Sequence, residues 1–296
     1  MKRIFTFALA AATALGFGLT ACKPSGKNAN SKTIANVGSD TMLQLGMAWS
    51  EAYKKVAPDI NVEVNGGGSG QGIAGLINGS VDLANSSKTI EDKEKADLKA
   101  KQGKDAVEVM VGYDALSIYV HKDNPMNEIS LEQLAEIYKD GGSVRNWADL
   151  GVSGIPGAKG DAIVVVSRQN NSGTHHYFKE AIVGKKVEER PDRTQLNGSA
   201  DVVNLIGTTP NAIGYSGMGY HNDKVKTLKV SKKKGETSVL PSVESTLDKT
   251  YPIARPMFVY TAGEPTATVK AYIDFILGEA GQKILKEQGY VPLPKK

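Results

Sequence analysis

The sequence predicts an α/β fold with mainly parallel sheets, divided into two lobes. Short β-branched segments alternate with segments of helical apolar spacing along most of the chain. The length of 296 residues is too great for one small core and fits two domains of average size. Two long apolar segments, residues 107–120 and 251–260, have the pattern of extended strands that could cross between two lobes.

The composition is that of a soluble globular chain, with 40% hydrophobic and 23% charged residues. The net charge of +4 is modest, aromatic residues make up only 6%, and no dense basic block is present. A nucleic-acid surface needs clustered Lys and Arg side chains, so we expect no nucleic-acid partner. We also expect the chain to act as a monomer.

The N-terminus has the pattern of a secretory signal peptide, expected over residues 1–21. Lys2 and Arg3 precede an apolar stretch, residues 4–19, which ends in the sequence Leu19-Thr20-Ala21-Cys22. These last four residues resemble the bacterial lipobox, in which the cysteine thiol receives a diacylglyceryl group. We therefore expect an exported protein whose lipid anchor on Cys22 holds it to the membrane, with residues 22–32 as a flexible tether. An ordinary cleaved signal peptide with a chance cysteine is the alternative.

Cys22 is also the only cysteine in the chain. A disulfide framework is thereby excluded, and thiol catalysis is not expected.

Three strands in the first third of the chain are each followed by a turn rich in hydroxyl groups or glycine. The strands are expected at residues 34–37, 60–64 and 81–84, and the turns at residues 38–41, 65–72 and 85–88. A helix with apolar residues at three-to-four spacing follows the first turn and ends before Pro58, and another begins near Glu91. Free N–H groups at such helix starts suit anions.

The second turn contains a match to the dinucleotide fingerprint GxGxxG, at residues 70–75. The next strand arrives before a dinucleotide-type helix could be completed, and no acidic residue closes a strand about 20 residues further on. We therefore reject a dinucleotide site on spacing.

Further elements follow the same alternation. Ser130 and Gln133 form a capping box that opens a helix through Tyr138, and Trp147 is the expected anchor of a loop over residues 141–160. The remaining predictions are strands at residues 162–166 and 212–215, and helices at residues 201–206, 265–277 and 280–288.

The stretch from Ser167 to Thr174 has the strongest pattern of an anion site. Ser172 lies near a helix start whose body can be residues 177–183, and the helix dipole there adds partial positive charge. Arg168 lies one turn earlier, where its planar fork could bind two oxygens of an oxyanion. The alternative is a plain N-cap preceded by a surface arginine.

In parallel α/β sheets, ligands collect at the carboxyl ends of the strands, where loops and helix starts face one cleft. The four turns described above carry hydroxyl groups and glycine but almost no aromatic or aliphatic bulk. The predicted ligand is therefore small, anionic and rich in hydrogen-bond acceptors.

With these motifs in order, the chain resembles the phosphate-binding lipoprotein component of bacterial phosphate ABC transporters, a type II periplasmic binding protein. The resemblance covers nearly all of residues 33–294. It rests on residues 37–41, 66–70, 86–88, 131–138, Asn146-Trp147, Arg168 with Ser172-Gly173-Thr174, residues 212–215, Tyr251-Pro252 and Arg255-Pro256.

The resemblance implies two α/β lobes with a ligand cleft between them that closes about a hinge. Lobe one would comprise residues 33–115 plus 253–296, and lobe two residues 116–252. It further implies high-affinity binding of inorganic phosphate outside the cytoplasmic membrane, delivery to ABC transporter permease subunits, and no cofactor. The implied phosphate contacts are Ser39, Asp40, Thr41, Ser69, Gly70, Ser86, Ser87, Arg168, Ser172, Gly173 and Thr174.

Two departures from the family pattern bear on the site. Many members carry an Asp, which accepts the proton of hydrogen phosphate, where this chain has Ser87, and the next residue is Lys88 where related members often carry Arg. Others carry an acid two residues after the arginine and paired with it; here that position is Asn170, so Arg168 is expected to be less firmly oriented.

Asp40 is our candidate for the missing proton acceptor. Phosphate at neutral pH keeps a proton and sulfate does not, so a buried carboxylate accepts from phosphate and repels sulfate. The alternative is that Asp40 merely caps its helix.

An enzyme is the main alternative from another class. No GxSxG nucleophile motif is present, and His175 and His176 lack the HExxH pattern or cysteine partners of a metal site. We therefore expect no catalytic residue and no metal, and a phosphate-handling hydrolase stays a minor alternative. Sulfate, molybdate or tungstate is the more serious competitor as ligand.

Overall fold

A computed structural model describes residues 32–294 of the chain. The expected signal peptide, Cys22 and all of the expected tether except Lys32 lie outside the described residues. Within residues 32–294, no helix combines the length and the apolar character that a membrane crossing requires.

The elements follow the predicted alternation. The strands are β1 (Lys32–Gly38), β2 (Ile60–Asn65), β3 (Leu83–Ser86), β4 (Ala106–His121), β5 (Glu128–Ser130), β6 (Val164–Arg168), β7 (Thr194–Leu196), β8 (Ala212–Gly217), β9 (Val225–Thr227), β10 (Lys229–Ser231) and β11 (Ala254–Ala262). The α-helices are α1 (Leu43–Val56), α2 (Ser69–Asn78), α3 (Asp92–Gln102), α4 (Leu131–Tyr138), α5 (Gly173–Phe178), α6 (Ser199–Thr208), α7 (Val243–Leu247), α8 (Ala267–Leu277) and α9 (Glu279–Glu287). A short 3-10 turn, η1 (Asp40–Met42), leads into α1, and a π-helical turn, η3 (Lys179–Val183), continues α5.

One sheet runs through the described residues in the strand order β2-β1-β3-β11-β4-β8-β6-β7, and β9 also pairs with β4. Strands β5 and β10 form a separate parallel pair. Every pairing that does not involve β4 or β11 is parallel, as the alternation of strands and helices predicts. The two long strands pair antiparallel with each other and with their neighbours. The sheet is therefore parallel on both sides and antiparallel in its middle.

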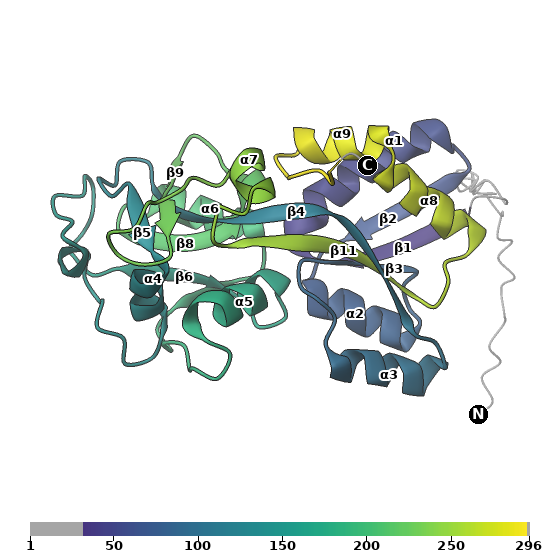
Figure 1. Cartoon of the computed structure of the whole chain (residues 1–296), viewed down its shortest axis with the longest axis horizontal. Coiled ribbons are helices and arrows are strands. Elements are labelled where there is room, and N and C mark those ends of the chain that lie inside the picture. Colours follow the sequence, from purple (N-terminus) through teal and green to yellow (C-terminus); the bar gives the residue numbers. More distant parts are fainter. Residues whose placement is uncertain (1–31, 295–296) are drawn as a thin grey trace, which may run out of the picture. The chain divides into compact units, whose positions relative to one another are not determined.

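The two long strands cross between two lobes (Figure 1). We call β1–β3, α1–α3, α8 and α9 lobe one, and β5–β10 with α4–α7 lobe two. Val111 of β4 belongs to the apolar core of lobe one, whereas Leu116 of the same strand belongs to the core of lobe two. Met257 and Val259 of β11 likewise pack in the core of lobe one. The crossing strands thus contribute to both cores, as their length in the sequence predicts.

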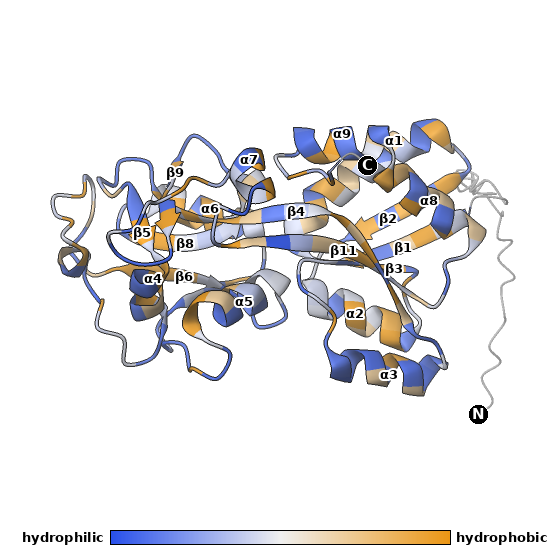
Figure 2. Cartoon of the chain, in the orientation of Figure 1, coloured by the Kyte–Doolittle hydropathy of each residue, from blue (hydrophilic) through white to orange (hydrophobic). Residues whose placement is uncertain are grey.

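Lobe one joins the two ends of the described chain. Leu45, Trp49 and Tyr53 lie on one face of α1 at three-to-four spacing and are buried. The Trp49 indole N–H donates to the Gly281 carbonyl in α9 at 2.8 Å, which fixes α1 against the C-terminal helices. Figure 2 shows α3 as largely hydrophilic, and Leu98 is its one buried residue, which suits an outer helix packed on α2.

Lobe two holds α5 through a cluster of aromatic rings. The rings of Phe178 and Tyr215 stack with centroids 3.8 Å apart, and Tyr138 meets Phe178 edge-on at 4.5 Å. The Tyr138 hydroxyl donates to the Val166 carbonyl at 2.9 Å. Ser130 and Gln133 cap α4 reciprocally, as predicted. The aromatic cluster therefore ties α4, α5, β6 and β8 together.

Candidate anion-binding site

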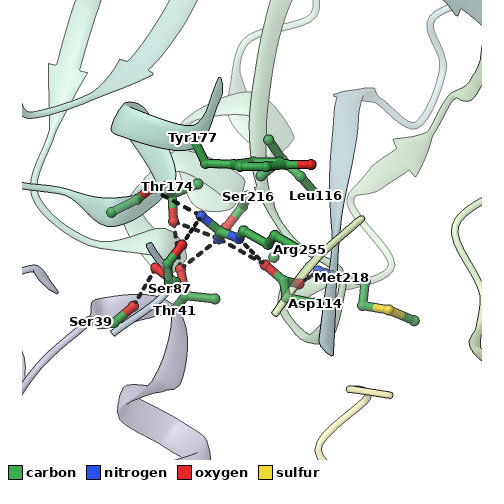
Figure 3. Close-up of polar contacts among 12 residues, drawn as sticks. Ser39, Thr41, Ser87, Asp114, Leu116, Thr174, Tyr177, Ser216, Met218 and Arg255 are labelled. Atoms are coloured by element: carbon green, nitrogen blue, oxygen red, sulfur yellow. Dashed lines mark hydrogen bonds and ion pairs between the residues drawn. The ribbon is translucent and has the colours of Figure 1, made fainter. Parts of the chain in front are cut away.

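Hydroxyl groups from both lobes converge where the strands β1, β3 and β6 end. Ser39 Oγ and Ser87 Oγ are 2.8 Å apart, and Ser69 Oγ accepts from the Ser87 backbone N–H at 3.1 Å. Thr41 Oγ1 of lobe one lies 2.6 Å from Thr174 Oγ1 of lobe two. All five side chains are buried. Figure 3 shows four of them, Ser39, Thr41, Ser87 and Thr174. The structure therefore brings together the hydroxyls that the sequence placed on separate turns.

Glycine allows the turns of lobe one to approach closely. Gly38 has φ +152°, and a Cβ there would lie 2.1 Å from the Asn85 carbonyl oxygen. This proximity lets the Ser39 N–H donate to Asn85 O at 2.8 Å, and the Gly68 N–H donate to Gly38 O at 2.9 Å. The first three turns are thus joined through backbone contacts.

Ser172 and Gly173 form the lobe-two side of the site. Ser172 is the N-cap of α5, as predicted, and its Oγ accepts from the Thr174 N–H at 3.2 Å and the His175 N–H at 3.3 Å. The helix begins at Gly173, earlier than the expected body at residues 177–183, because the cap places the first turn directly after Ser172. A Cβ on Gly173 would lie 2.3 Å from Ser69 Oγ, so only glycine permits this approach of the two lobes.

Gly70 also meets lobe two, through its backbone. The Gly70 N–H donates to the Asn171 carbonyl at 3.1 Å, and the Asn171 side chain donates to the Gly67 carbonyl at 2.8 Å. The glycine-rich loop therefore contacts the loop between Arg168 and Ser172.

The Ser86 hydroxyl is engaged away from this cluster. It donates to the Lys88 carbonyl at 2.7 Å and accepts from the Lys88 N–H at 3.3 Å, so it closes its own turn. The Lys88 ammonium pairs with Glu94 of α3 at 2.8 Å and with Glu91, the N-cap of α3, at 3.3 Å. Neither side chain joins the hydroxyl cluster.

Arg168 is the last residue of β6 and is fully buried, not a surface arginine. Its Nη2 donates to Asp40 Oδ2 at 2.9 Å and to the Asn197 carbonyl, and its Nη1 donates to Ser199 Oγ at 2.8 Å. Burial lowers the pKa of the Arg168 guanidinium, and the Asp40 carboxylate beside it opposes that shift. The expectation that Asn170 leaves this arginine less firmly oriented is therefore wrong, because lobe one supplies the carboxylate.

Both carboxylate oxygens of Asp40 accept hydrogen bonds from residues outside its own helix. Oδ2 accepts from Arg168, and Oδ1 accepts from the Gly67 backbone N–H at 2.9 Å. The alternative in which Asp40 only caps its helix does not describe these contacts.

Two charged residues that the sequence did not assign to the site lie at its centre. Arg255 of β11 and Asp114 of β4 are both buried, and Arg255 Nη2 donates to Asp114 Oδ2 at 2.8 Å (Figure 3). The same guanidinium reaches Thr41 and Thr174. The available sequence signal was that Arg255 is the one charged residue of segment 251–260, and that Asp114 is one of the two charged residues, with Glu108, of segment 107–120.

His175 and His176 lie on α5 beside the cluster, each with a carboxylate partner. His175 Nε2 is 2.6 Å from Glu189 Oε2, and His176 Nε2 is 2.9 Å from Glu91 Oε1 across the lobes. In the part of the chain that the structure describes, no three His, Cys, Asp or Glu side chains are grouped to hold a metal ion.

Comparison with known proteins identifies the family. The PBP superfamily domain matches residues 23–280. The chain is 34% identical over 284 residues to the phosphate-binding protein PstS of Pseudomonas aeruginosa, across 93% of this chain and 86% of that protein. It is 32% identical over 270 residues to the phosphate-binding protein PstS of Bacillus subtilis, across 90% of this chain and 82% of that protein.

Solved structures agree with these relatives. A Clostridium perfringens protein solved with bound phosphate is 31% identical, with a TM-score of 0.78, and the match covers 88% of this chain and all 100% of that one. An ABC-type phosphate transport receptor from Vibrio cholerae is 26% identical, with a TM-score of 0.68 and coverages of 88% and 100%. The chain therefore belongs to the PBP superfamily and, within it, to the PstS-type phosphate-binding proteins.

Proposed function

We propose that this chain binds inorganic phosphate between its two lobes and delivers it to the permease subunits of an ABC transporter for uptake. The observation that carries the proposal is the meeting of Thr41 Oγ1 and Thr174 Oγ1, 2.6 Å apart, at the centre of a buried hydroxyl cluster drawn from both lobes. Hydroxyl groups can donate to every oxygen of a tetrahedral oxyanion. Family membership supports phosphate as that anion.

The proposed binding residues are those that the resemblance implied. The hydroxyl donors would come from Ser39, Thr41, Ser69, Ser87, Ser172 and Thr174. Gly173 would supply a backbone N–H group, Arg168 a guanidinium and Asp40 an acceptor. The Gly70 N–H, which donates to the Asn171 carbonyl at 3.1 Å, would exchange that acceptor for a phosphate oxygen. Ser86 would act through its backbone, because its hydroxyl closes its own turn. Phosphate oxygens would replace the direct hydrogen bond between the Thr41 and Thr174 hydroxyls across the cleft.

The energetics of this site suit micromolar or tighter binding. Hydrogen bonds to a charged group contribute on the order of 1.5–3 kcal/mol each, and micromolar affinity needs about 8 kcal/mol. A set of donors as large as the one proposed meets that requirement after the costs of desolvation and lobe closure.

Asp40 is the proposed acceptor for the proton that phosphate carries and sulfate lacks. Each of its carboxylate oxygens already accepts one hydrogen bond, which leaves lone-pair capacity for a protonated ligand oxygen. This acceptor would favour phosphate over sulfate. Molybdate and tungstate are competitors that differ from phosphate in size as well as in protonation.

The lobe boundaries of the proposal are residues 33–115 plus 253–296 for lobe one and 116–252 for lobe two. The packing supports boundaries within a few residues of these, because the core changes between Val111 and Ala115 on β4 and between Ala254 and Met257 on β11. Ala115 and Ala254 themselves pack with the core of lobe two. Closure about these two strands would trap the ligand.

We further propose that the chain works outside the cytoplasmic membrane, as a lipid-anchored monomer held through Cys22. The lipobox-like sequence before this cysteine supports the anchor. Labelling of the expressed protein with a radioactive fatty acid tests it: label should enter the wild-type chain and be absent from Cys22→Ser. Equal labelling of both chains would refute the anchor.

Isothermal titration calorimetry with phosphate, sulfate and molybdate at two pH values tests the function. We expect phosphate to bind most tightly and sulfate to be disfavoured. Tighter binding of sulfate or molybdate would reassign the ligand. A phosphatase assay on a phosphomonoester addresses the hydrolase alternative, and steady turnover there would overturn the binding-protein role.

A further inference from the structure

We propose that Arg255 is a positioning residue. It bridges the two lobes through hydrogen bonds and directs the hydroxyl protons of Thr41 and Thr174 toward the ligand. The proposal rests on phosphate being the ligand, as proposed above. It assigns to Arg255 the control of how fast phosphate leaves the closed cleft.

The Arg255 guanidinium contacts ligand-facing elements of both lobes at once. In lobe one, Nη1 donates to the Ser87 carbonyl at 3.0 Å and Nη2 approaches Thr41 Oγ1 at 3.4 Å. In lobe two, Nη1 donates to the Gly173 carbonyl at 3.1 Å and Nη2 donates to Thr174 Oγ1 at 2.9 Å. Each terminal nitrogen therefore serves both lobes (Figure 3).

Asp114 holds the guanidinium in the orientation that this bridging requires. Arg255 and Asp114 lie opposite each other in the antiparallel pair of β11 and β4. Asp114 Oδ2 accepts from Arg255 Nε at 3.1 Å and from Nη2 at 2.8 Å, while Oδ1 accepts from the Met218 N–H at 3.2 Å. Two hydrogen bonds from Arg255 to one oxygen of a carboxylate, whose other oxygen is held by the Met218 N–H, restrict rotation of the guanidinium.

The aromatic ring of Tyr177 lies over one face of the Arg255 guanidinium. Arg255 Cζ lies 5.4 Å from the ring centroid, within the range of a cation–π contact. The Tyr177 hydroxyl donates to the Ala254 carbonyl at 2.8 Å, which ties α5 of lobe two directly to β11. Arg255 is therefore held by Asp114, by its acceptors in the two lobes and by the Tyr177 ring, without any contact to a ligand.

The direction of the hydrogen bonds from Arg255 determines the roles of the Thr41 and Thr174 hydroxyl groups. A guanidinium has donors only, so each threonine Oγ1 must act as acceptor toward Arg255. The hydroxyl protons of Thr41 and Thr174 are then free to point away from Arg255. In the liganded cleft both would donate to anion oxygens, which is the polarity that an oxyanion requires.

Opening of the lobes would break part of this arrangement. Donors of Arg255 that face one lobe would lose their protein acceptors, and hydrogen bonds made by a charged group are stronger than those between neutral groups. Asp114 keeps Arg255 on the crossing strands, so the closed state gains the whole set of contacts while the open state keeps only part of it. Loss of these contacts should appear mainly in the rate of phosphate release.

Arg255→Lys is the test variant, because lysine keeps the positive charge but lacks the planar fork that reaches four acceptors and Asp114. Release of radiolabelled inorganic phosphate is followed by chase with excess unlabelled phosphate on the full chain. We expect dissociation at least about tenfold faster than in the wild-type chain, with association changed by less than about threefold.

Arg190→Lys is the matched control. Arg190 is also buried and paired with an acid, Asp192, and it donates to the Ile137 carbonyl, so all of these contacts lie in lobe two. The Arg190→Lys chain should therefore release phosphate at the wild-type rate, even if the substitution lowers the stability of the chain.

An unchanged dissociation rate in a folded Arg255→Lys chain would overturn the proposal, as would an equal rise in Arg190→Lys. If Arg255→Lys does not fold, the phosphate dissociation rate of Asp114→Asn is measured and judged by the same criterion. Asparagine keeps the shape of the aspartate side chain but lacks the negative charge that binds the Arg255 guanidinium. A wild-type chain that binds no phosphate would overturn the proposed function instead, so the two failures are distinguishable.

Discussion

Oδ2 of Asp40 in lobe one accepts a hydrogen bond from Nη2 of Arg168 in lobe two at 2.9 Å, between residues 128 positions apart in the chain. Related members are expected to pair this arginine with an acid two residues later, within one lobe, where this chain has Asn170. The ion pair here spans the cleft. Orientation of Arg168 and approach of the lobes are therefore coupled.

Replacement of Arg168 by alanine should weaken phosphate binding by at least about tenfold. The substitution removes the guanidinium and leaves the partly buried Asp40 carboxylate without its cationic partner, and hydrogen bonds to charged groups contribute about 1.5–3 kcal/mol each. Calorimetric titration with phosphate measures the effect, and Arg190→Ala serves as the control for loss of a buried arginine. Unchanged affinity in a folded Arg168→Ala chain would remove this residue from the site.

Asp40→Asn should reduce the preference for phosphate over sulfate. The amide cannot present two acceptor oxygens, and its NH₂ group can donate to sulfate, so discrimination by the proton is lost. Competition titrations with both ions measure the ratio of affinities. Asp201→Asn is the charge-matched control, because the Asp201 carboxylate accepts from the Gly198 N–H at the start of α6, outside the hydroxyl cluster. If the Asp40 variant keeps the wild-type ratio, Asp40 is not the acceptor.

Gly173→Ala should abolish tight phosphate binding while the ligand-free chain keeps its stability. The new Cβ would lie 2.3 Å from Ser69 Oγ and 2.8 Å from Ser87 Oγ, which prevents the approach of lobe two to these hydroxyls. Within α5 itself alanine is favourable relative to glycine. Calorimetry and urea unfolding without phosphate separate the two effects. Retention of wild-type affinity would contradict the close approach seen here.

Acid should destabilise the chain partly through Asp192. The hydrogen bond from the Arg190 side chain lowers the pKa of Asp192 to about 2. Because the folded-state pKa is depressed, the stabilisation is complete above the unfolded value of about 4 and is lost as pH falls toward about 2. The carboxylate is largely exposed, so the contribution is small.

Asp192→Asn should therefore make the free energy of unfolding less dependent on pH between about 4 and 2, with a constant offset from wild type above pH of about 5. Urea unfolding at a series of pH values measures both. An identical acid dependence in the two chains would show that the Arg190–Asp192 pair contributes nothing there.

Local patterns in the sequence were sufficient to predict most elements. The capping box at Ser130 and Gln133, the N-cap at Ser172, and the apolar spacing of α1 each depend on residues within about one or two turns of each other. The two crossing strands were also predictable, because a long apolar extended segment is visible in sequence. Their antiparallel pairing was not, since strand order is not encoded in the period of one strand.

The sequence by itself determined the α/β class, the helix starts and the hydroxyl-rich turns of an anion site. Only the tertiary structure decided which side chains meet there: Asp40 beside Arg168, Ser86 turned into its own loop, and Arg255 with Asp114 at the centre. The partners in the two ion pairs are 128 and 141 positions apart. Such contacts follow from the order of the strands and the approach of the lobes, which depend on packing of the whole chain and not on neighbouring residues.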